Sequence, residues 1–185
     1  AFHPKRSPAN WTSSVCTCIR GRRSWYLLFG AMTSAIMLYG FSLLYGFSGT
    51  TDLDAIAQAF QGGAMPAAPV IGSLLLVLVG FGFKISAVPF HFWAPDVYEG
   101  APTPVAGFLS TASKAAGFAV LVRFMLVVFP MKETVEAWAP VLASLSVATM
   151  TLGNLVALAQ KNVKRLLAYS SIAHAGYALI GVIAA

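Results

Sequence analysis

The chain has 185 residues, of which 58% are hydrophobic and 10% are charged, and its formal net charge at pH 7 is +6. A soluble domain of this length cannot bury so large a share of apolar residues in one core. The composition therefore excludes a soluble globular domain and indicates an integral membrane protein.

Residues 1–24 form a basic, polar N-terminal segment that contains Cys16 and Cys18. A lone C-x-C pair is a weak metal or redox signal, so we expect no function for it. No apolar signal-peptide segment precedes Trp25. The first residue is Ala1 rather than methionine, and we therefore expect the chain to be a piece of a longer protein.

Five apolar stretches follow, each long enough, or nearly so, for the roughly 20 residues that a membrane-spanning helix needs. Four of them, residues 24–51, 55–83, 137–160 and 166–185, contain no Asp, Glu, Lys or Arg, and a fifth covers residues 103–129. Because irregular lipid-facing backbone is costly, we predict an all-α, polytopic transmembrane helix bundle over residues 25–185. Its helices are expected at about 25–47, 67–93, 103–129, 138–160 and 165–185.

The second predicted helix carries Lys84 inside its apolar run and Pro89 shortly after it. Proline lacks an N–H and clashes with the carbonyl four residues earlier, so we predict that this helix is broken near Pro89. Broken helices at membrane depth line cavities and form ion sites in transporters. His91 would share the face of Lys84 if the helix continued, and it is either a proton relay or a structural histidine.

The third predicted helix has one small and polar face, formed by Thr103, Gly107, Ser110, Lys114 and Gly117. Such a face points into protein or water, and Ser110 can hydrogen-bond to Lys114 one turn away. A close-packing stripe would explain the small residues but not the lysine. Arg123 lies near the helix end, where we expect its side chain to snorkel to the interface.

Ionisable side chains at membrane depth are costly and mark functional sites. A low-dielectric environment disfavours the charged form of a lysine, so a lysine there can hold and release a proton. We therefore predict that Lys84 and Lys114 are buried proton carriers on neighbouring helices. The alternative for Lys84 is that its ammonium snorkels to an interface. No predicted span contains Asp or Glu, so we expect the acidic partner of these lysines to lie elsewhere.

Basic residues are distributed unevenly between the two sides of this five-span map. Residues 1–24, 94–102 and 161–165 share one side, and they contain Lys5, Arg6, Arg20, Arg22, Arg23, Lys161, Lys164 and Arg165. The opposite loops contain only Lys132. The positive-inside rule then predicts a cytoplasmic N-terminus in the cell inner membrane. Contacts with anionic lipid explain the net charge, so we expect the lipid bilayer as a partner and no nucleic acid.

Two long stretches carry a family resemblance: GFGFKISAVPFHFWAPDVYEGAPTPVAGFLSTASKAAGF and GNLVALAQKNVKRLLAYSSIAHAGYALIG, residues 80–118 and 153–181. Both resemble the subunit N family of the proton-pumping NADH:quinone oxidoreductase, complex I. The stretch WYLLFGAMTSAIMLYGFSLLYG looks like the preceding helix of that family. Subunits L and M and the sodium/proton antiporter relatives are similar as well, but PDVYEGAP followed by ASK is the subunit N form.

The resemblance implies that this chain supplies part of a larger antiporter-like membrane subunit. In the family, the lysines of GFK and ASK are assigned to the proton path, and those roles pass to Lys84 and Lys114. His91, Lys164 and His174 also match motif positions, and the last two, with Ser110, are expected to belong to a polar network. The family's acidic residue and a further lysine belong to helices outside this chain. Residues 8–24 match no part of the pattern, which is what a frame error in a gene model would produce.

We therefore expect a proton-translocating subunit of NADH:quinone oxidoreductase that couples quinone reduction to proton transfer through buried lysines. Its partners would be other membrane subunits of complex I, and quinone and NADH would be used by the whole complex. The chain itself lacks the cysteines and Gly-rich fingerprint of redox cofactor sites, so we expect no cofactor or metal in it and no activity of the isolated fragment. The alternatives are a subunit of a cation/proton antiporter, a haem-binding membrane anchor that uses His91 and His174, and an inactive assembly remnant.

Overall fold

The computed structural model describes residues 9–61, 67–129 and 132–184, which form eight helices and no strand. They are α1 (Ala9–Ser48), α2 (Leu53–Gln61), α3 (Ala67–Ile85), α4 (Trp93–Gly100), α5 (Thr103–Ser110), α6 (Ala112–Val128), α7 (Lys132–Leu158) and α8 (Val163–Ala184). Five helical stretches in these residues are long and apolar enough to cross a membrane: Tyr26–Ser48, Ala68–Ile85, Thr103–Val128, Trp138–Leu158 and Val163–Ala184. The predicted all-α transmembrane bundle is confirmed.

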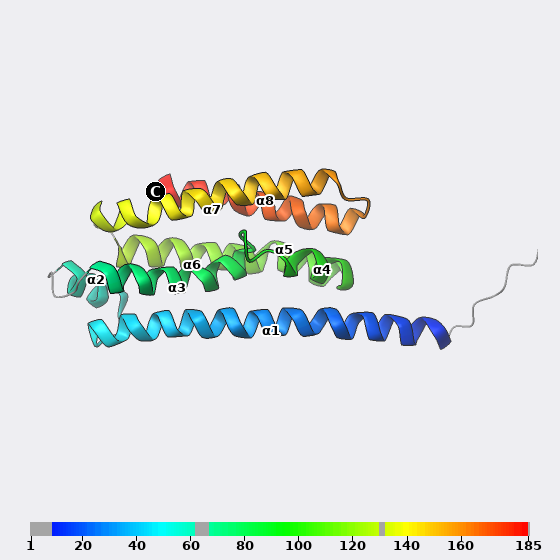
Figure 1. Cartoon of the computed structure of the whole chain (residues 1–185), viewed down its shortest axis with the longest axis horizontal. Coiled ribbons are helices and arrows are strands. Elements are labelled where there is room, and N and C mark those ends of the chain that lie inside the picture. Colours follow the sequence, from blue (N-terminus) through cyan, green and yellow to red (C-terminus); the bar gives the residue numbers. More distant parts are fainter. Residues whose placement is uncertain (1–8, 62–66, 130–131, 185) are drawn as a thin grey trace, which may run out of the picture.

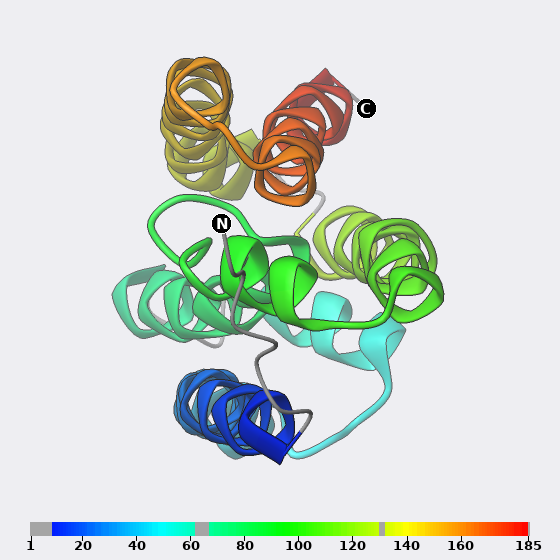
Figure 2. The same ribbon diagram turned by 90° about the vertical axis from the view of Figure 1, so that its right-hand side faces the viewer.

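The long helices lie side by side in three layers, as Figures 1 and 2 show. Helix α1 forms the first layer and packs on α3, and the pair α7 and α8 forms the third. The middle layer contains α3, α4 and α6, and α4 contacts both α1 and α8. The short helix α4 is therefore held between the two outer layers.

One end of the bundle collects the segments that were expected to share a side of the membrane. The start of α1, the helix α4 and the connection between α7 and α8 all lie at this end in Figure 1. Helix α2 and the end of α6 lie at the opposite end. The backbone arrangement therefore agrees with the alternation of the five-span map.

Several helix boundaries differ from the expected ones. Helix α1 begins at Ala9 rather than near residue 25, although only Tyr26–Ser48 is apolar enough for a span. Residues 10–24 contain no proline, so nothing in their sequence stops a helix that extends beyond the apolar part. Helix α2 was missed because it is short and amphipathic rather than continuously apolar. The side chains of Cys16 and Cys18, and all of residues 1–8, lie outside the described residues.

Two of the spans are interrupted. Helix α3 ends at Ile85 and α4 starts at Trp93, so the predicted break near Pro89 is confirmed. A second interruption at Thr111, between α5 and α6, was not predicted because no proline or glycine marks it. Its backbone hydrogen bonds continue, since Thr111 donates to the Gly107 carbonyl at 3.2 Å and Ala115 donates to the Thr111 carbonyl at 2.9 Å. The second interruption is thus a local distortion within one span, whereas the first separates two helices.

Two clusters of buried apolar side chains hold the layers together. The larger one joins α3, α6, α7 and α8 and includes Val77, Phe124, Met125, Leu142 and Leu179. The smaller one fixes α4 against α8 and consists of Phe83, Trp93, Ala94, Tyr98, Ala168 and Ile172. Burial of these side chains therefore determines where the second half of the broken helix lies.

Candidate functional site

The break between α3 and α4 is held by side chains from other parts of the molecule. The buried Val88 N–H donates to the Thr149 hydroxyl of α7 at 3.0 Å, and the Trp93 indole N–H donates to the Phe83 carbonyl at 3.0 Å. The peptide bond between Val88 and Pro89 is cis, and Ser86 has a φ of 60°. These partners satisfy polar backbone groups that the interruption removes from the helix, as buried backbone requires.

Lys84 lies in the last turn of α3, directly before this break. Its side chain is exposed and forms no hydrogen bond or ion pair within the described chain. The expected burial of Lys84 is therefore not provided by the helices of the described chain. The physical reason is that α3 is apolar around much of its circumference, so its sequence does not reveal which face the neighbouring helices cover.

Lys114, in the first turn of α6, is buried as predicted, with 6% of the residue exposed. Its ammonium donates to the Ser171 hydroxyl at 2.8 Å and to the Ser171 backbone carbonyl at 3.0 Å. Both acceptors are neutral groups on α8, and the described residues provide no carboxylate in contact with Lys114. A buried ammonium therefore rests on hydrogen bonds alone.

The predicted hydrogen bond from Ser110 to Lys114 is not formed. The Ser110 hydroxyl instead donates to the Gly107 carbonyl at 2.8 Å, within its own helix. The distortion at Thr111 separates the two residues, and the side chain of Lys114 turns to α8. The sequence could not reveal this partner, because Ser171 follows Lys114 by 57 residues.

The two lysines lie on neighbouring helices, as predicted. A Cβ added at Gly117 of α6 would lie 3.8 Å from the Cβ of Lys84, and Gly117 follows Lys114 by about one turn. The aliphatic base of Lys84 is therefore close to the helix that carries Lys114.

His91 and Pro89 both belong to the turn between α3 and α4. His91 is 8% exposed and its ring lies against Phe92, and its Nδ1 atom has no hydrogen-bond partner in the described chain. Since α3 ends before it, His91 does not continue the helical face of Lys84 that the sequence suggested. Its expected relay role stays a prediction.

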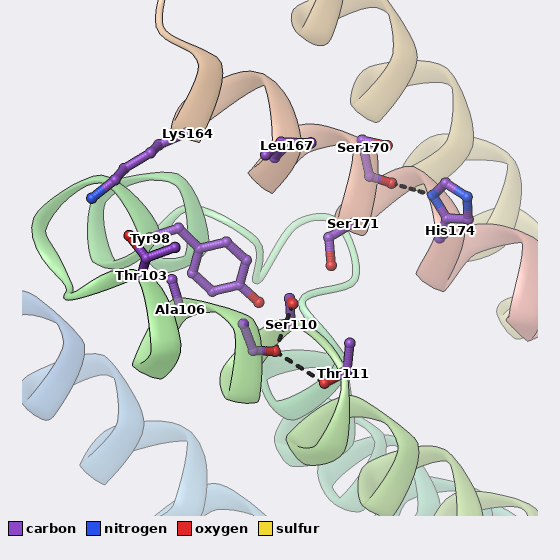
Figure 3. A pocket seen from close by; sticks show the side chains of 11 residues that line it. Tyr98, Thr103, Ala106, Ser110, Thr111, Lys164, Leu167, Ser170, Ser171 and His174 are labelled. Carbon is purple, nitrogen blue, oxygen red and sulfur yellow. Dashed lines mark hydrogen bonds between the residues drawn. The ribbon is translucent and has the colours of Figure 1, made fainter.

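A pocket of about 460 Å³ opens between α4, α5 and α8 (Figure 3). It brings together the predicted residues Ser110, Lys164 and His174, and its wall also contains Tyr98 and Ser171. Lys164 donates to the Ala101 carbonyl at 3.2 Å, and His174 Nδ1 lies 2.7 Å from the Ser170 carbonyl. Three residues that the sequence grouped as a polar network thus share one pocket, although no hydrogen bond joins them directly.

An ion-pair cluster beside the pocket was not predicted. Arg165 Nη2 lies 2.7 Å from Asp96 Oδ1, and its Nε lies 3.3 Å from Glu99 Oε2. The Asn162 amide also donates to Glu99 at 3.3 Å. These contacts tie α4 to the start of α8. The spacing of Asp96 and Glu99 on one helical face was a usable signal, but this segment was expected to be a loop.

Among the described residues, no group of three or more His, Cys, Asp or Glu side chains could hold a metal ion. The side chains that line the pocket include lysine, serine, tyrosine and histidine. All four side chains can donate hydrogen bonds, and serine, tyrosine and histidine can also accept one without a change of charge.

Comparisons with known proteins assign the fold to a family. The family described as NADH:quinone oxidoreductase/Mrp antiporter, transmembrane, matches residues 24–185. NADH-quinone oxidoreductase subunit N of Chlorobium chlorochromatii is 58% identical over 164 residues, which cover 85% of this chain and 32% of that protein. The chain thus spans about a third of the length of this curated relative.

Solved structures give the same assignment. A chain of respiratory complex I from Thermus thermophilus has a TM-score of 0.72 and 44% identity, covering 88% of this chain and 34% of its own length. A chain of the Mrp complex from Dietzia has a TM-score of 0.77 and 25% identity, covering 88% of this chain and 29% of its own length. The resemblance to subunit N is confirmed, and the chain belongs to the transmembrane family of NADH:quinone oxidoreductase and Mrp antiporter subunits.

Proposed function

We propose that this chain forms part of the proton-transferring domain of a subunit N of NADH:quinone oxidoreductase, with Lys84 and Lys114 as proton carriers. The observation that carries the proposal is the environment of Lys114. Its ammonium is buried in an apolar span and is bound only by the neutral Ser171. Burying an unpaired charge is expensive, so a site that can lose its proton relieves this cost.

Lys84 supports the proposal in a different way. It lies at membrane depth beside a helix break, and it has no partner in the described chain. A complete subunit is about three times as long as the matched region, because the match covers 32% of the relative. We expect helices outside this chain to cover Lys84 and to supply the carboxylate that pairs with it.

The same proposal assigns partners and location. The chain is a multi-pass membrane protein, and we expect it to assemble with other membrane subunits in the cell inner membrane. We expect it to hold no redox cofactor, so that NADH and quinone react elsewhere in the complex. The basic segments at one end of the bundle support a cytoplasmic location for that end.

A chimera tests the function without requiring the remaining two-thirds of this protein. The matching stretch of the Chlorobium chlorochromatii subunit N is replaced by residues of this chain, and the complex is assembled around it. We expect NADH oxidation to remain coupled to proton uptake by membrane vesicles. An assembled complex that oxidises NADH at the normal rate without pumping would contradict the proposal.

Orientation needs a separate measurement. Reporters fused within residues 161–165 and after Ala185 should lie on opposite sides of the membrane, the first in the cytoplasm. Two reporters on the same side would contradict the five-span arrangement, and an inverted pair would contradict only the proposed orientation.

One alternative has structural support: the similarity to a chain of an Mrp complex favours a cation/proton antiporter subunit as the second candidate. Proton movement that depends on a sodium gradient rather than on NADH would select it. No contact in the described residues favours a haem anchor, since His91 lies in the turn after α3 and His174 lies in the pocket wall on α8. A Soret absorbance band of the purified protein is the observation that such an anchor requires.

A further inference from the structure

Helix α4 is held by a different kind of contact towards each of its ends. At its start, Trp93 is buried, and its indole N–H donates to the Phe83 carbonyl of α3 at 3.0 Å. Further along α4, Asp96 and Glu99 contact Arg165 of α8 at 2.7 Å and 3.3 Å. The first anchor is buried, whereas the second is ionic and partly exposed.

The ion-pair cluster of Asp96, Glu99 and Arg165 specifies the orientation of α4 as well as its distance from α8. Arg165 Nη2 lies beside Asp96 and Nε lies beside Glu99, so one planar guanidinium contacts two carboxylates about one helical turn apart. The Asn162 amide also donates to Glu99 at 3.3 Å. A single exposed ion pair contributes little stability, but two contacts of one rigid group define a geometry. The cluster can therefore position α4 without being a main source of stability.

The basic residues at the start of α8 are unfavourable within their own helix. Lys164 and Arg165 directly follow the first residue of α8, and no acidic residue lies in its first turn. A helix N-terminus carries a partial positive charge, so two cations there are disfavoured. Between the helices the same charges are favourable, because Lys164 donates at 3.2 Å to the carbonyl of Ala101, the C-cap of α4. Residues that break a local rule and are compensated by a distant contact are typical of functional sites.

Helix α4 connects this cluster to the helix break. The hydrogen bond from Trp93 joins the start of α4 to the carbonyl of Phe83, which is the residue before Lys84 in the last turn of α3. Helix α4 has only eight residues, and a short helix moves nearly as a rigid element. A displacement of α4 at the ion-pair cluster would therefore be transmitted to the backbone beside Lys84.

We infer that Arg165 is a positioning residue for the proton-transferring site. Through Asp96 and Glu99 it sets the position of α4, and through α4 it sets the geometry of the break beside Lys84. The inference rests on the proposed role of Lys84 as a proton carrier. It adds a residue on another helix that acts on Lys84 without touching it.

Hydrogen exchange of the chimeric complex tests whether Arg165 fixes α4. Arg165→Gln should raise the exchange rates of the α4 amides by about two- to fivefold, the size expected for the loss of partly exposed ion pairs. Exchange in α6 should not change. Lys161→Gln is the matched control, because Lys161 lies in the connection between α7 and α8, and its exposed side chain forms no ion pair or hydrogen bond in the described chain. Unchanged exchange of α4 in an assembled Arg165→Gln complex would overturn the inference.

Proton uptake per NADH tests whether this position matters for transfer. Arg165→Gln should lower the uptake by about threefold or more, since small displacements of reacting groups can cost up to about a hundredfold. Arg165→Lys keeps the positive charge and should recover part of the loss, and Lys161→Gln should pump normally. The amount of subunit in the purified complex controls for assembly. Normal uptake by Arg165→Gln, or equal losses in the glutamine and lysine variants, would overturn the inference.

A double-mutant cycle tests whether Arg165 acts through α4. Arg165→Gln removes the contact from the side of α8, and Asp96→Asn removes it from the side of α4. Because both variants remove the same contact, the combined variant should pump no worse than Arg165→Gln alone. Fully additive losses would mean that Arg165 acts through other groups, and they would overturn the inference.

Lys84 variants separate this inference from the proposed function. If Lys84→Met pumps normally, the carrier role of Lys84 is wrong, and the positioning role of Arg165 is wrong with it. If Lys84→Met stops pumping while Arg165→Gln pumps normally, the carrier role stands and only the positioning role is wrong. Faster exchange in α4 together with reduced pumping in Arg165→Gln would support both.

Discussion

Lys84 and Lys114 both lie beside an interruption of a membrane span, yet their surroundings differ. Lys84 is exposed at the end of α3 and precedes a full break, whereas Lys114 is buried and follows a mild distortion in the span from Thr103 to Val128. The break near Lys84 is held by a hydrogen bond from the Val88 N–H to Thr149 and by one from Trp93 to the Phe83 carbonyl, and Lys114 donates to Ser171. The groups that hold each of these regions thus include residues far away in the sequence, such as Thr149 and Ser171.

The largest expected effect is at Lys114. Lys114→Met removes the protonatable group, and Lys114→Arg replaces it with a guanidinium that does not lose its proton in proteins. Both should lower NADH-driven proton uptake by about a hundredfold in the chimeric complex. Arginine is also larger than lysine, so assembly of each variant must be checked by the amount of subunit in the purified complex. Pumping by an assembled arginine variant at the normal rate would refute proton transfer at this position.

Lys84 gives the second test. The side chain is exposed in the described chain, but we expect helices outside it to cover Lys84, so assembly of Lys84→Arg must be checked by the amount of subunit in the purified complex. If Lys84 carries protons, both Lys84→Arg and Lys84→Met should reduce coupled proton uptake by about tenfold or more. If it only supplies a positive charge, arginine should preserve pumping and methionine should not. Parallel measurement of proton uptake and NADH oxidation distinguishes these outcomes.

The contact between α7 and α8 leaves little room for a larger side chain at Gly176. A Cβ at Gly176 of α8 would lie 2.7 Å from Met150 Cγ and 2.9 Å from the Met150 backbone nitrogen. Gly176→Ala should therefore separate α7 from α8 and destabilise the fold by about 1–3 kcal/mol. Gly181→Ala is the matched control, since a Cβ there meets nothing within 4 Å. Thermal unfolding of the reconstituted protein measures both, and equal midpoints would contradict the close contact.

An effect of similar size is expected at the break beside Lys84. Thr149→Val removes the hydroxyl that accepts from the Val88 N–H and leaves this buried donor without a partner. The loss should cost about 1–3 kcal/mol of stability and increase motion of the turn before α4. Thr149→Ser restores the acceptor and should recover most of the stability. Amide exchange at Val88 reports the change directly, and unchanged protection in the valine variant would mean that Thr149 does not hold the break.

Much of the fold could be predicted because its determinants are local. Hydropathy located the five spans, and Pro89 located the break, since a missing N–H and a clashing ring act within one helical turn. The distortion at Thr111 had no such local mark, and the short amphipathic α2 did not resemble a span.

The candidate site could be predicted only in part. Lys114 was correctly expected to be buried, but Ser110 was the wrong partner, and the contacts of Arg165 with Asp96 and Glu99 were missed.

The sequence by itself determined that the chain is a membrane protein, which stretches cross the bilayer and where one of them breaks. These properties follow from transfer of apolar side chains into lipid and from backbone hydrogen bonding within single helices. Only the tertiary structure decided that Lys84 is exposed while Lys114 binds Ser171, and that Tyr98 and Ser171 border the same pocket. The physical reason is that burial and hydrogen-bond partners depend on which helix faces meet. That choice is made by packing between residues far apart in the chain, such as Lys114 and Ser171.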